Sequence, residues 1–332
     1  MINPLEIENL LSEAEVVYSW NYAAQNEKLR ALYEKGKRDQ WNAANDLDWS
    51  IDVDPEDPQM FPEQSAVLYG SEIWARLTTR ERTRMLHENT AWRLSNFLHG
   101  EQGALLATAQ IVVSVPFIDA KFYGATQVMD EGRHVEVYQR YLQEKIGITY
   151  PINSDLKSLL DLLLCDKRWD IKYLGMQIII EGLALAAIAV LRHVYNEPLL
   201  QRLLGYVMQD EARHVAFGVI SVADFYRELS ETERREREEF AYQACLLMRD
   251  RLTGSEMFEK MGLPVKECVE FVENSPMMLE FRQLLFSRVI PNLKKLGLLG
   301  SHIRPKYEAL GLLRFENEPT SDEELHLKPQ VM

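Results

Sequence analysis

Residues 130–134 read Asp-Glu-Gly-Arg-His, and residues 210–214 repeat the pattern as Asp-Glu-Ala-Arg-His. A further glutamate precedes the glutamate of each motif by the same thirty residues: Glu101 in the first case and Glu181 in the second. The repeated unit is therefore a glutamate followed by Glu-x-x-His. Four carboxylates and two imidazoles in this order are the ligand set with which four-helix bundles hold a pair of metal ions.

The spacing between the glutamates fits two antiparallel helices. At about 1.5 Å per residue, a ligand fifteen residues from the turn lies about 22 Å from it, and its partner returns to the same depth. Within Glu-x-x-His, the two side chains are three residues apart, so they share one face of a helix and can share a metal. The sequence thus predicts six ligands on four helices: Glu101, Glu131, His134, Glu181, Glu211 and His214.

The surroundings of the first glutamate in each unit also favour a metal. Glu181 stands between the apolar runs 178–180 and 183–186, and Glu101 precedes the apolar run 104–107. An ionised glutamate in an apolar helix is costly unless a cation or partner balances it. Oxygen and nitrogen ligands suit iron or manganese, and the absence of cysteine ligands argues against structural zinc. We expect two iron ions, with manganese or a mixed Mn/Fe pair as alternatives.

The remaining charged residues of the motifs are predicted to support the ligands. Asp130 and Asp210 are expected to accept the second ring N–H of a ligating histidine, on the opposite helix where the geometry allows it. Arg133 and Arg213 would then balance the charge of these aspartates. The alternative is that the aspartates are plain surface acids.

The pattern of apolar residues and helix breakers predicts an all-α protein. Thr78 and Glu81 form a capping box, and helical periodicity continues from there to Pro116. Further long helices are expected over about 117–146, 169–195 and 198–228. We therefore predict a metal-binding four-helix core at about 79–228 within a single helical domain, residues 1–332.

Additional helices are expected at both ends of this core. Residues 1–78 and 229–313 are predicted to be flanking helical segments, with an amphipathic pattern over 4–34. The polar, proline-bearing stretch 46–58 predicts a long surface loop. Residues 314–332 are polar and are expected to form a loose tail.

Bulk composition narrows the function class and the location. The net charge of −14 argues against a nucleic-acid partner. The three cysteines form no CxxC pair, which favours a reducing compartment. No signal peptide is visible, and the most apolar run, 178–191, is too short to span a bilayer and contains Glu181. We expect a cytoplasmic protein that does not enter a membrane.

The motifs resemble the ferritin-like di-iron carboxylate superfamily over roughly residues 80–225. Within it, the twin Asp-Glu-x-Arg-His motifs look like those of bacterial multicomponent monooxygenase hydroxylase subunits, and ribonucleotide reductase small subunits share the bundle. The resemblance implies an enzyme that activates O₂ to hydroxylate or oxygenate a small organic substrate. It also implies two iron sites, one held by Glu101, Glu131 and His134 and the other by Glu181, Glu211 and His214.

Two positions depart from the relatives. The monooxygenases usually place a threonine four residues after the third glutamate, where this chain has Leu185. Arylamine N-oxygenases of the superfamily carry an additional histidine ligand four residues before the last Glu-x-x-His, where this chain has Val207. Val207 weighs against N-oxygenation, which we keep as an alternative function.

Two other functions stay open at this point. Tyr138 lies one helical turn after His134, where ribonucleotide reductase small subunits hold a tyrosyl radical; the alternative is a core tyrosine near the site. Non-catalytic iron storage, as in ferritins, is disfavoured by the additional helices at both ends.

No Gly-rich phosphate-binding loop is present, so we expect no bound nucleotide or flavin. An external reductase or ferredoxin would then supply electrons, and a homodimer is possible. The substrate cavity is expected beside the first two helices of the bundle, with Leu105 and Thr108 as candidate walls.

Overall fold

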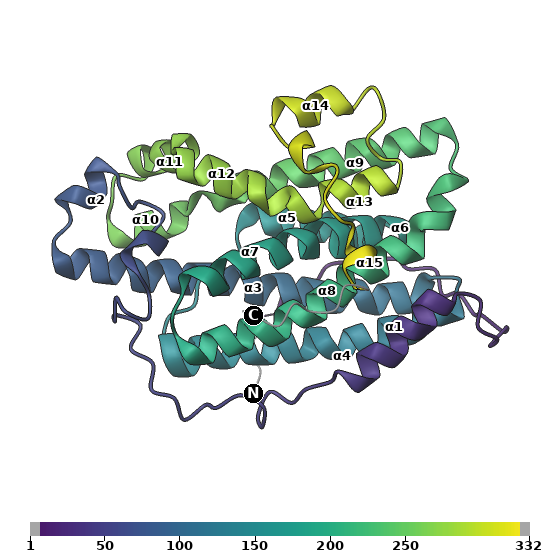
Figure 1. Cartoon of the computed structure of the whole chain (residues 1–332), viewed down its shortest axis with the longest axis horizontal. Coiled ribbons are helices and arrows are strands. Elements are labelled where there is room, and N and C mark those ends of the chain that lie inside the picture. Colours follow the sequence, from purple (N-terminus) through teal and green to yellow (C-terminus); the bar gives the residue numbers. More distant parts are fainter. Residues whose placement is uncertain (1–6, 326–332) are drawn as a thin grey trace.

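The computed structural model describes residues 7–325, and within them it contains helices and no strand. Four long helical segments form the centre (Figure 1): α3 (Thr79–Ser114), α4 (Ile118–Tyr141), a continuous run over Trp169–Val194, and α8 (Pro198–Arg227). α3 packs against α4, and the third segment packs against α8. α4 also contacts α8, and α3 contacts the third segment, which closes the ring. The predicted all-α four-helix bundle is confirmed.

The third segment of the bundle is not a uniform α-helix. It consists of α6 (Trp169–Lys172), the π-helical η4 (Tyr173–Ile180) and α7 (Glu181–Val194). π-Helical turns are rare and occur frequently at functional sites. Here the wider turns end directly before Glu181, so the helix changes its winding where this side chain projects into the bundle.

Local sequence sets the ends of these helices. Thr78 and Glu81 form the predicted capping box at the start of α3. After α4, the one-turn π-helix η3 (Leu142–Ile146) leads to Gly147, whose φ of 73° suits glycine. Glu197 caps α8 through the backbone N–H groups of Leu199 and Leu200. The turns therefore fall where the sequence predicted them.

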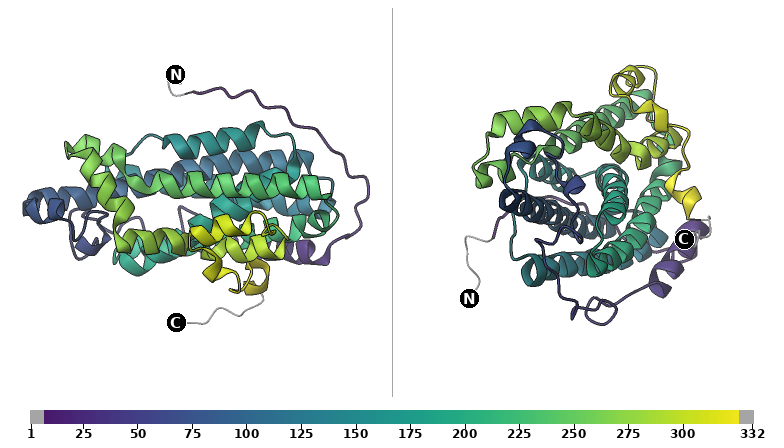
Figure 2. Two further views of the ribbon diagram at one scale, coloured as in Figure 1. Left: turned by 90° about the horizontal axis from the view of Figure 1, so that it is seen from above. Right: turned by 60° about the vertical axis from the view of Figure 1, so that its left-hand side comes forward.

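Shorter helices cover the bundle at both ends and along one side (Figure 2). On the N-terminal side they are α1 (Glu27–Arg38), η2 (Glu63–Ser65) and α2 (Glu72–Arg76), and α5 (Ser154–Cys165) joins the two halves of the bundle. The C-terminal region adds α9 (Glu231–Asp250), η5 (Arg251–Thr253), α10 (Ser255–Met261), α11 (Val265–Asn274), α12 (Pro276–Leu285), η6 (Phe286–Arg288), α13 (Ile290–Lys295), α14 (Arg304–Ala309), η7 (Leu313–Phe315) and α15 (Ser321–Glu324).

The helix predicted over 4–34 is wrong for most of its length. Residues 7–25 are extended and run along the outside of the bundle to α1, which starts at Glu27 (Figure 2); residues 4–6 lie outside the described part of the chain. The extended segment bonds to the bundle instead of to itself: the N–H of Val17 donates to the carbonyl of Val113 at 3.0 Å. Helix propensity is a weak prior that such tertiary contacts override. The loop predicted over 46–58 is present.

The loose tail predicted over 314–332 is also partly wrong. The Asn292 amide donates to the Ser321 hydroxyl at 2.9 Å, and Lys295 pairs with Asp322 at 2.6 Å. These contacts fix residues up to 325 against α13, whereas residues 326–332 lie outside the described part of the chain.

The segment Trp169–Val194 is long and apolar enough to cross a membrane by composition, but 78% of its apolar window is buried inside the bundle. The apolar character of this segment therefore reflects its place in the core of the bundle.

α8 packs closely against η4 at Gly218. A Cβ at Gly218 would lie 2.7 Å from the Cβ of Gln177, so any larger residue would push α8 away from η4.

Candidate metal centre

The bundle brings all six predicted ligands together in its interior. Each of the four helices contributes, and each of the six residues is at most 5% exposed. The residues are Glu101 on α3, Glu131 and His134 on α4, Glu181 at the start of α7, and Glu211 and His214 on α8. As their spacing in the sequence predicts, the six side chains lie at a similar depth in the bundle and face its interior.

Distances at the two histidines show how the carboxylates are shared. The Nδ1 atom of His134 lies 3.5 Å from Oε2 of Glu131 and 3.2 Å from Oε1 of Glu211. The Nδ1 atom of His214 lies 3.1 Å from Oε1 of Glu131 and 3.5 Å from Oε2 of Glu211. Glu131 and Glu211 therefore each present one oxygen to each histidine, which is the arrangement of a carboxylate that bridges two cations.

Glu101 and Glu181 each belong to only one of the two groups of ligand atoms. Oε2 of Glu101 lies 3.3 Å from Nδ1 of His134. Glu181 groups with Glu131 and His214, with ligand atoms within 4.8 Å of one another. The geometry thus describes two adjacent positions with Glu101 and Glu181 at opposite ends.

The polar atoms at the centre fit a pair of cations. Among the described residues, Oε2 of Glu131, Oε2 of Glu181, both carboxylate oxygens of Glu211 and Nδ1 of His214 have no hydrogen-bond partner. Leaving buried acceptors unsatisfied costs about 1–3 kcal/mol each, and more when they are charged. Divalent cations would satisfy these atoms and balance the four carboxylates. The donor set of oxygen and imidazole nitrogen suits iron or manganese.

Behind the ligands, the aspartate of each motif contacts the histidine of the other motif. Nε2 of His134 lies 3.1 Å from Oδ2 of Asp210, and Nε2 of His214 lies 3.2 Å from Oδ2 of Asp130. Each aspartate thus holds the histidine of the opposite helix, as the sequence predicted, and turns its Nδ1 toward the glutamates. Such contacts fix the ring and its tautomer and raise the basicity of the ligand.

The motif arginines balance these aspartates. Arg133 contacts Asp130 of its own helix and lies 3.1 Å from Asp210. Arg213 contacts Asp210 of its own helix and lies 3.4 Å from Asp130. The two motifs therefore form one cross-linked network of two aspartates and two arginines.

Three residues of this network were missed at the level of sequence. The Gln127 amide donates to Oε1 of Glu131 and of Glu181, both at 2.9 Å. The Gln40 amide and the Trp41 indole donate to Asp130 and Asp210, each at 2.8 Å. Gln127 lies one turn before Glu131 on the same face of α4, so its contact with Glu131 could have been predicted from the spacing. The other two come from the segment after α1, and no local pattern marks them.

Tyr138 is buried next to the centre but joins no hydrogen bond within the described residues. Its hydroxyl has no partner, and its ring stacks on Phe97 with centroids 5.6 Å apart. Burial raises the pKa of Tyr138 well above its usual value, and the charge of Glu101 acts in the same direction. Its side chain is therefore a neutral phenol packed in the core, and a radical role stays a prediction.

The metal-free cluster holds extra protons at neutral pH. Burial raises the pKa of Glu101 to about 8, and burial also raises the pKa of Glu181 well above its usual value. For the histidines, burial lowers the pKa, but the facing carboxylates, Glu101 at His134 and Glu131 at His214, outweigh it and raise both pKa values. Metal ligation requires deprotonated carboxylates and neutral imidazoles.

We therefore expect metal uptake to release protons near pH 7. Because the cations compete with these protons, the apparent metal affinity should fall as the pH is lowered and rise as it is increased toward 8. Calorimetry of metal uptake in buffers with different heats of ionisation measures the released protons directly. Uptake without proton release would contradict the raised pKa values.

Two small chambers lead to the centre. The inner chamber, about 20 Å³, is lined by Glu101, Glu181 and Glu211. The outer chamber, about 60 Å³, is lined mainly by apolar residues of α3, α7, α9 and α12. Both chambers share Asn96, Phe97, Ala184 and Arg251.

Leu105 and Thr108, the expected walls of the substrate cavity, line neither chamber. The Thr108 hydroxyl accepts a hydrogen bond from Gln177 at 3.1 Å. Both chambers lie between the first and third segments of the bundle, and the walls of the substrate cavity stay a prediction.

The sequence matches the family model for p-aminobenzoate N-oxygenase AurF over residues 23–297. The chain belongs to this family. From the sequence, arylamine N-oxygenation is kept only as an alternative, because Val207 replaces the expected additional histidine. In the structure Val207 is fully buried in an apolar cluster. The departure at Val207 therefore does not exclude the chain from the family.

Solved structures share its fold. An R2-like ligand-binding oxidase variant anaerobically reconstituted with a Mn/Fe cofactor aligns with a TM-score of 0.53 and 20% identity, covering 82% of this chain and 94% of that chain. The R2-like ligand-binding oxidase with an aerobically reconstituted Mn/Fe cofactor, after a long soak, gives a TM-score of 0.51 and 18% identity, covering 83% and 97%. No curated protein sequence matches this chain.

These findings confirm the ferritin-like fold and a carboxylate–histidine di-metal site. As a member of the AurF family, the protein is an O₂-dependent di-iron oxidoreductase.

Proposed function

We propose that this protein N-oxygenates a small aromatic amine at a metal pair held by Glu101, Glu131, His134, Glu181, Glu211 and His214. The observation that carries the proposal is the inner chamber, which opens directly onto three of these carboxylates. Because the metal pair would balance these carboxylates, this end of the chamber suits an uncharged amine. The AurF family model, described as p-aminobenzoate N-oxygenase, supports the same class of substrate.

The protein's own residues prepare the site for this chemistry. The bound metal pair supplies the redox chemistry that activates O₂. Asp130 and Asp210 hold the imidazoles in orientation, and Gln127 orients Glu131 and Glu181. The apolar outer chamber excludes bulk water from the reacting amine.

The first oxygenation needs electrons from outside the chain. An aromatic amine, O₂, two electrons and two protons give an aryl hydroxylamine and one water; an N–O bond forms and the O–O bond breaks. A separate reductase or ferredoxin is the proposed donor, because the sequence carries no motif for a nucleotide or flavin.

We also propose a cytoplasmic homodimer. The three cysteines are free, which is compatible with a reducing compartment. The extended segment 7–25 exposes Leu11, Tyr18 and Trp20, and clustered exposed apolar side chains are typical of protein interfaces. A monomeric mass in solution at micromolar concentration would contradict the dimer.

Turnover of 4-aminobenzoate tests the function. Iron-loaded protein supplied with a chemical reductant and ¹⁸O₂ is expected to yield 4-hydroxylaminobenzoate carrying one ¹⁸O, detected by mass spectrometry. A Glu211→Ala variant should lose this product, because Glu211 faces both histidines. Hydroxylation of a ring carbon without any N-oxygenated product would overturn the proposal in favour of a monooxygenase acting on carbon.

A further inference from the structure

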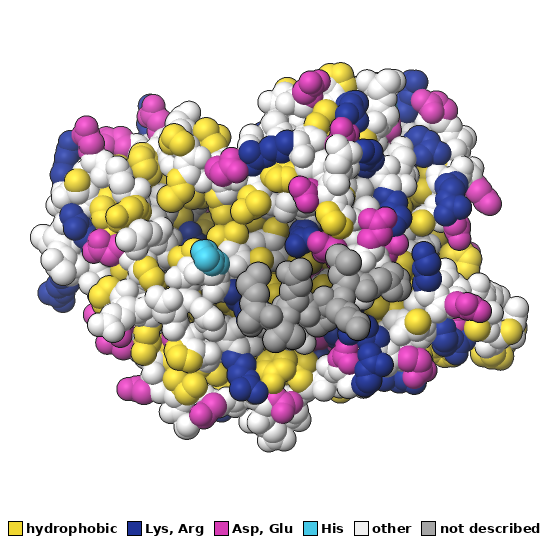
Figure 3. Space-filling view, viewed as in Figure 1, with side chains coloured by type: hydrophobic (Ala, Val, Ile, Leu, Met, Phe, Trp, Pro, Cys, Tyr) yellow, Lys and Arg dark blue, Asp and Glu magenta, His cyan; other side chains and the backbone are white. Residues whose placement is uncertain are grey.

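A groove of about 550 Å³ lies outside the metal centre, between α12 and the segment 308–312. It is visible as the hollow between α12 and the α14 region (Figure 3). The groove contains no candidate metal ligand and shares no lining residue with the two chambers. Small-molecule sites are usually clefts of about 300–1,000 Å³, so the groove has the size of a separate ligand site.

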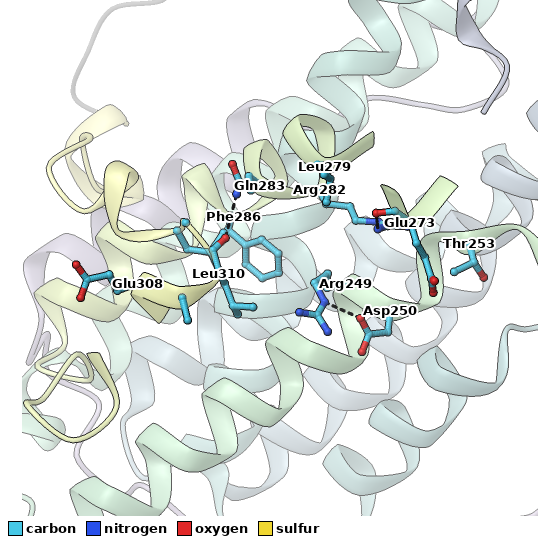
Figure 4. Close-up of a pocket in the computed structure, with 13 residues that line it drawn as sticks. Arg249, Asp250, Thr253, Glu273, Leu279, Arg282, Gln283, Phe286, Glu308 and Leu310 are labelled. Atoms are coloured by element: carbon cyan, nitrogen blue, oxygen red, sulfur yellow. Dashed lines mark hydrogen bonds and ion pairs between the residues drawn. The ribbon is translucent and has the colours of Figure 1, made fainter. Parts of the chain in front are cut away.

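The walls of the groove are held by contacts within the chain. The Gln283 amide of α12 donates to the carbonyl of Leu310 at 3.0 Å, which ties the two walls together. Leu279, Phe286 and Leu310 supply an apolar lining (Figure 4). The groove is therefore preformed and suits a ligand with a compact apolar body.

Arg282 lines the groove and lacks a counter-charge. The residue is 8% exposed, and it forms no ion pair with a described carboxylate. Its Nη1 donates to the carbonyl of Glu273 at 3.4 Å, whereas its Nε and Nη2 have no hydrogen-bond partner in the described part of the chain. Burial lowers the pKa of Arg282, and the charge of Glu273 offsets this only in part. A buried cation without a counter-charge costs free energy that a bound anion would recover.

The unpartnered edge of Arg282 is the edge that binds a carboxylate elsewhere in this chain. Arg237 contacts Asp170 through Nε at 3.0 Å and through Nη2 at 3.3 Å. A guanidinium presents this pair of N–H donors in a geometry that matches a carboxylate. The bond from Arg282 to the Glu273 carbonyl is longer than a usual N–H···O bond, so it holds the guanidinium weakly and lets it turn toward a ligand.

The acidic residues of the groove do not neutralise Arg282. Asp250 pairs with Arg249 at 2.6 Å, and both Glu273 and Glu308 are exposed. Water solvates exposed carboxylates and salt screens them, whereas a buried charge is screened much less. The buried guanidinium therefore decides the charge of the ligand, although acids outnumber arginines along the groove.

We infer that the groove binds an organic carboxylate with a compact apolar body, with the carboxylate on Arg282 and the apolar part against Phe286 and Leu310. The site is separate from the metal pair, and the inference holds whichever reaction the metal pair supports.

α12 connects this site to the outer chamber. Leu279 and Arg282 of this helix line the groove, whereas Met278, Phe281 and Leu285 on another of its faces line the outer chamber. A ligand on Arg282 would therefore hold the helix that forms one wall of the outer chamber. Since backbone amides exchange through local opening, bound ligand is expected to slow amide hydrogen exchange in α12.

Calorimetry on the full-length, metal-loaded protein tests the site with three compounds that share one ring: cyclohexanecarboxylate, cyclohexanol and cyclohexylamine. We expect cyclohexanecarboxylate to bind at least about tenfold more tightly than either of the others, the size of effect that a hydrogen-bonded charge supplies. Arg282→Gln should lose this factor, and Arg282→Lys should keep part of it because the positive charge remains. Arg314→Gln is the matched control, because Arg314 is an exposed arginine that pairs with Glu280 of α12 and does not line the groove. Amide exchange in α12, with and without cyclohexanecarboxylate, locates the bound ligand.

Equal affinity for cyclohexanecarboxylate and cyclohexanol would overturn the inference, and tighter binding of cyclohexylamine would assign the groove to cations instead. An Arg282→Gln variant that is folded by circular dichroism and keeps full affinity for cyclohexanecarboxylate would also overturn it. If that variant does not fold, the wild-type protein still decides. Carboxylate-specific binding that slows exchange in α12 supports the site, and such binding with unchanged exchange in α12 refutes it.

Discussion

Replacing Glu131 by alanine is expected to reduce the metal content from about two ions per chain to nearly none. Glu131 belongs to both groups of ligand atoms, and each of its oxygens faces a different histidine. Removing it takes one ligand from each ion and removes one of two shared negative charges that hold the cations close together. Loss of a single bridging carboxylate therefore affects both positions at once.

Replacing Glu181 is expected to have a smaller effect on the metal content than replacing Glu131. Glu181→Ala removes a ligand from one group only, so about one ion should be retained. In the metal-free protein, burial raises the pKa of Glu181 well above its usual value. The side chain is also buried and accepts a hydrogen bond from Gln127, so thermal unfolding of the metal-free variant is measured beside that of wild type to separate metal loss from misfolding.

Metal analysis by mass spectrometry after anaerobic loading with Fe²⁺ measures these contents. Glu136→Ala is the control, because Glu136 lies on the same helix as Glu131 but is exposed. Two ions in the Glu131→Ala variant, or equal losses in the Glu131→Ala and Glu136→Ala variants, would refute the shared-ligand arrangement.

The sequence was sufficient to predict that the six candidate ligands and the two aspartates behind them come together, because these relations are local. Glu131 and His134 share a helix face through their spacing alone, whatever lies around them. Asp130 precedes Glu131 and must point to a different face, which in a four-helix core means a neighbouring helix. The cross-bundle pairing with His214 then follows from the antiparallel arrangement.

The remaining parts of the site depend on contacts that no local pattern encodes. Trp41 reaches Asp210 from 169 residues away, and Arg251 meets Asn96 from 155 residues away. The segment 7–25 has a helical pattern but is extended, and it contacts the bundle through the Val17 N–H and the hydroxyls of Ser12 and Ser19. Val207 weighs against N-oxygenation at the level of sequence, although the family model matches the chain over residues 23–297.

Replacing Asp170 by alanine is expected to destabilise the protein by about 3–5 kcal/mol, the usual cost of breaking one side of a buried ion pair. Asp170 on α6 accepts from Nε of Arg237 on α9 at 3.0 Å and from its Nη2 at 3.3 Å. Both side chains are almost completely buried. This pair ties α9, and therefore the segment that carries Arg251, to the third segment of the bundle.

Urea unfolding measures the loss in the free energy of unfolding, and two further variants serve as controls. Glu231→Ala removes an exposed i, i+4 partner of Arg235 on the same helix, so its effect should stay within about 0.5 kcal/mol. The double variant Asp170→Leu with Arg237→Met removes both charges and should recover most of the stability, because apolar residues can replace a buried pair with little loss. If Asp170→Ala costs no more than Glu231→Ala, the pair does not anchor α9. If the double variant is as unstable as the single one, packing explains the loss, rather than an arginine left with only the exposed Glu236 as its partner.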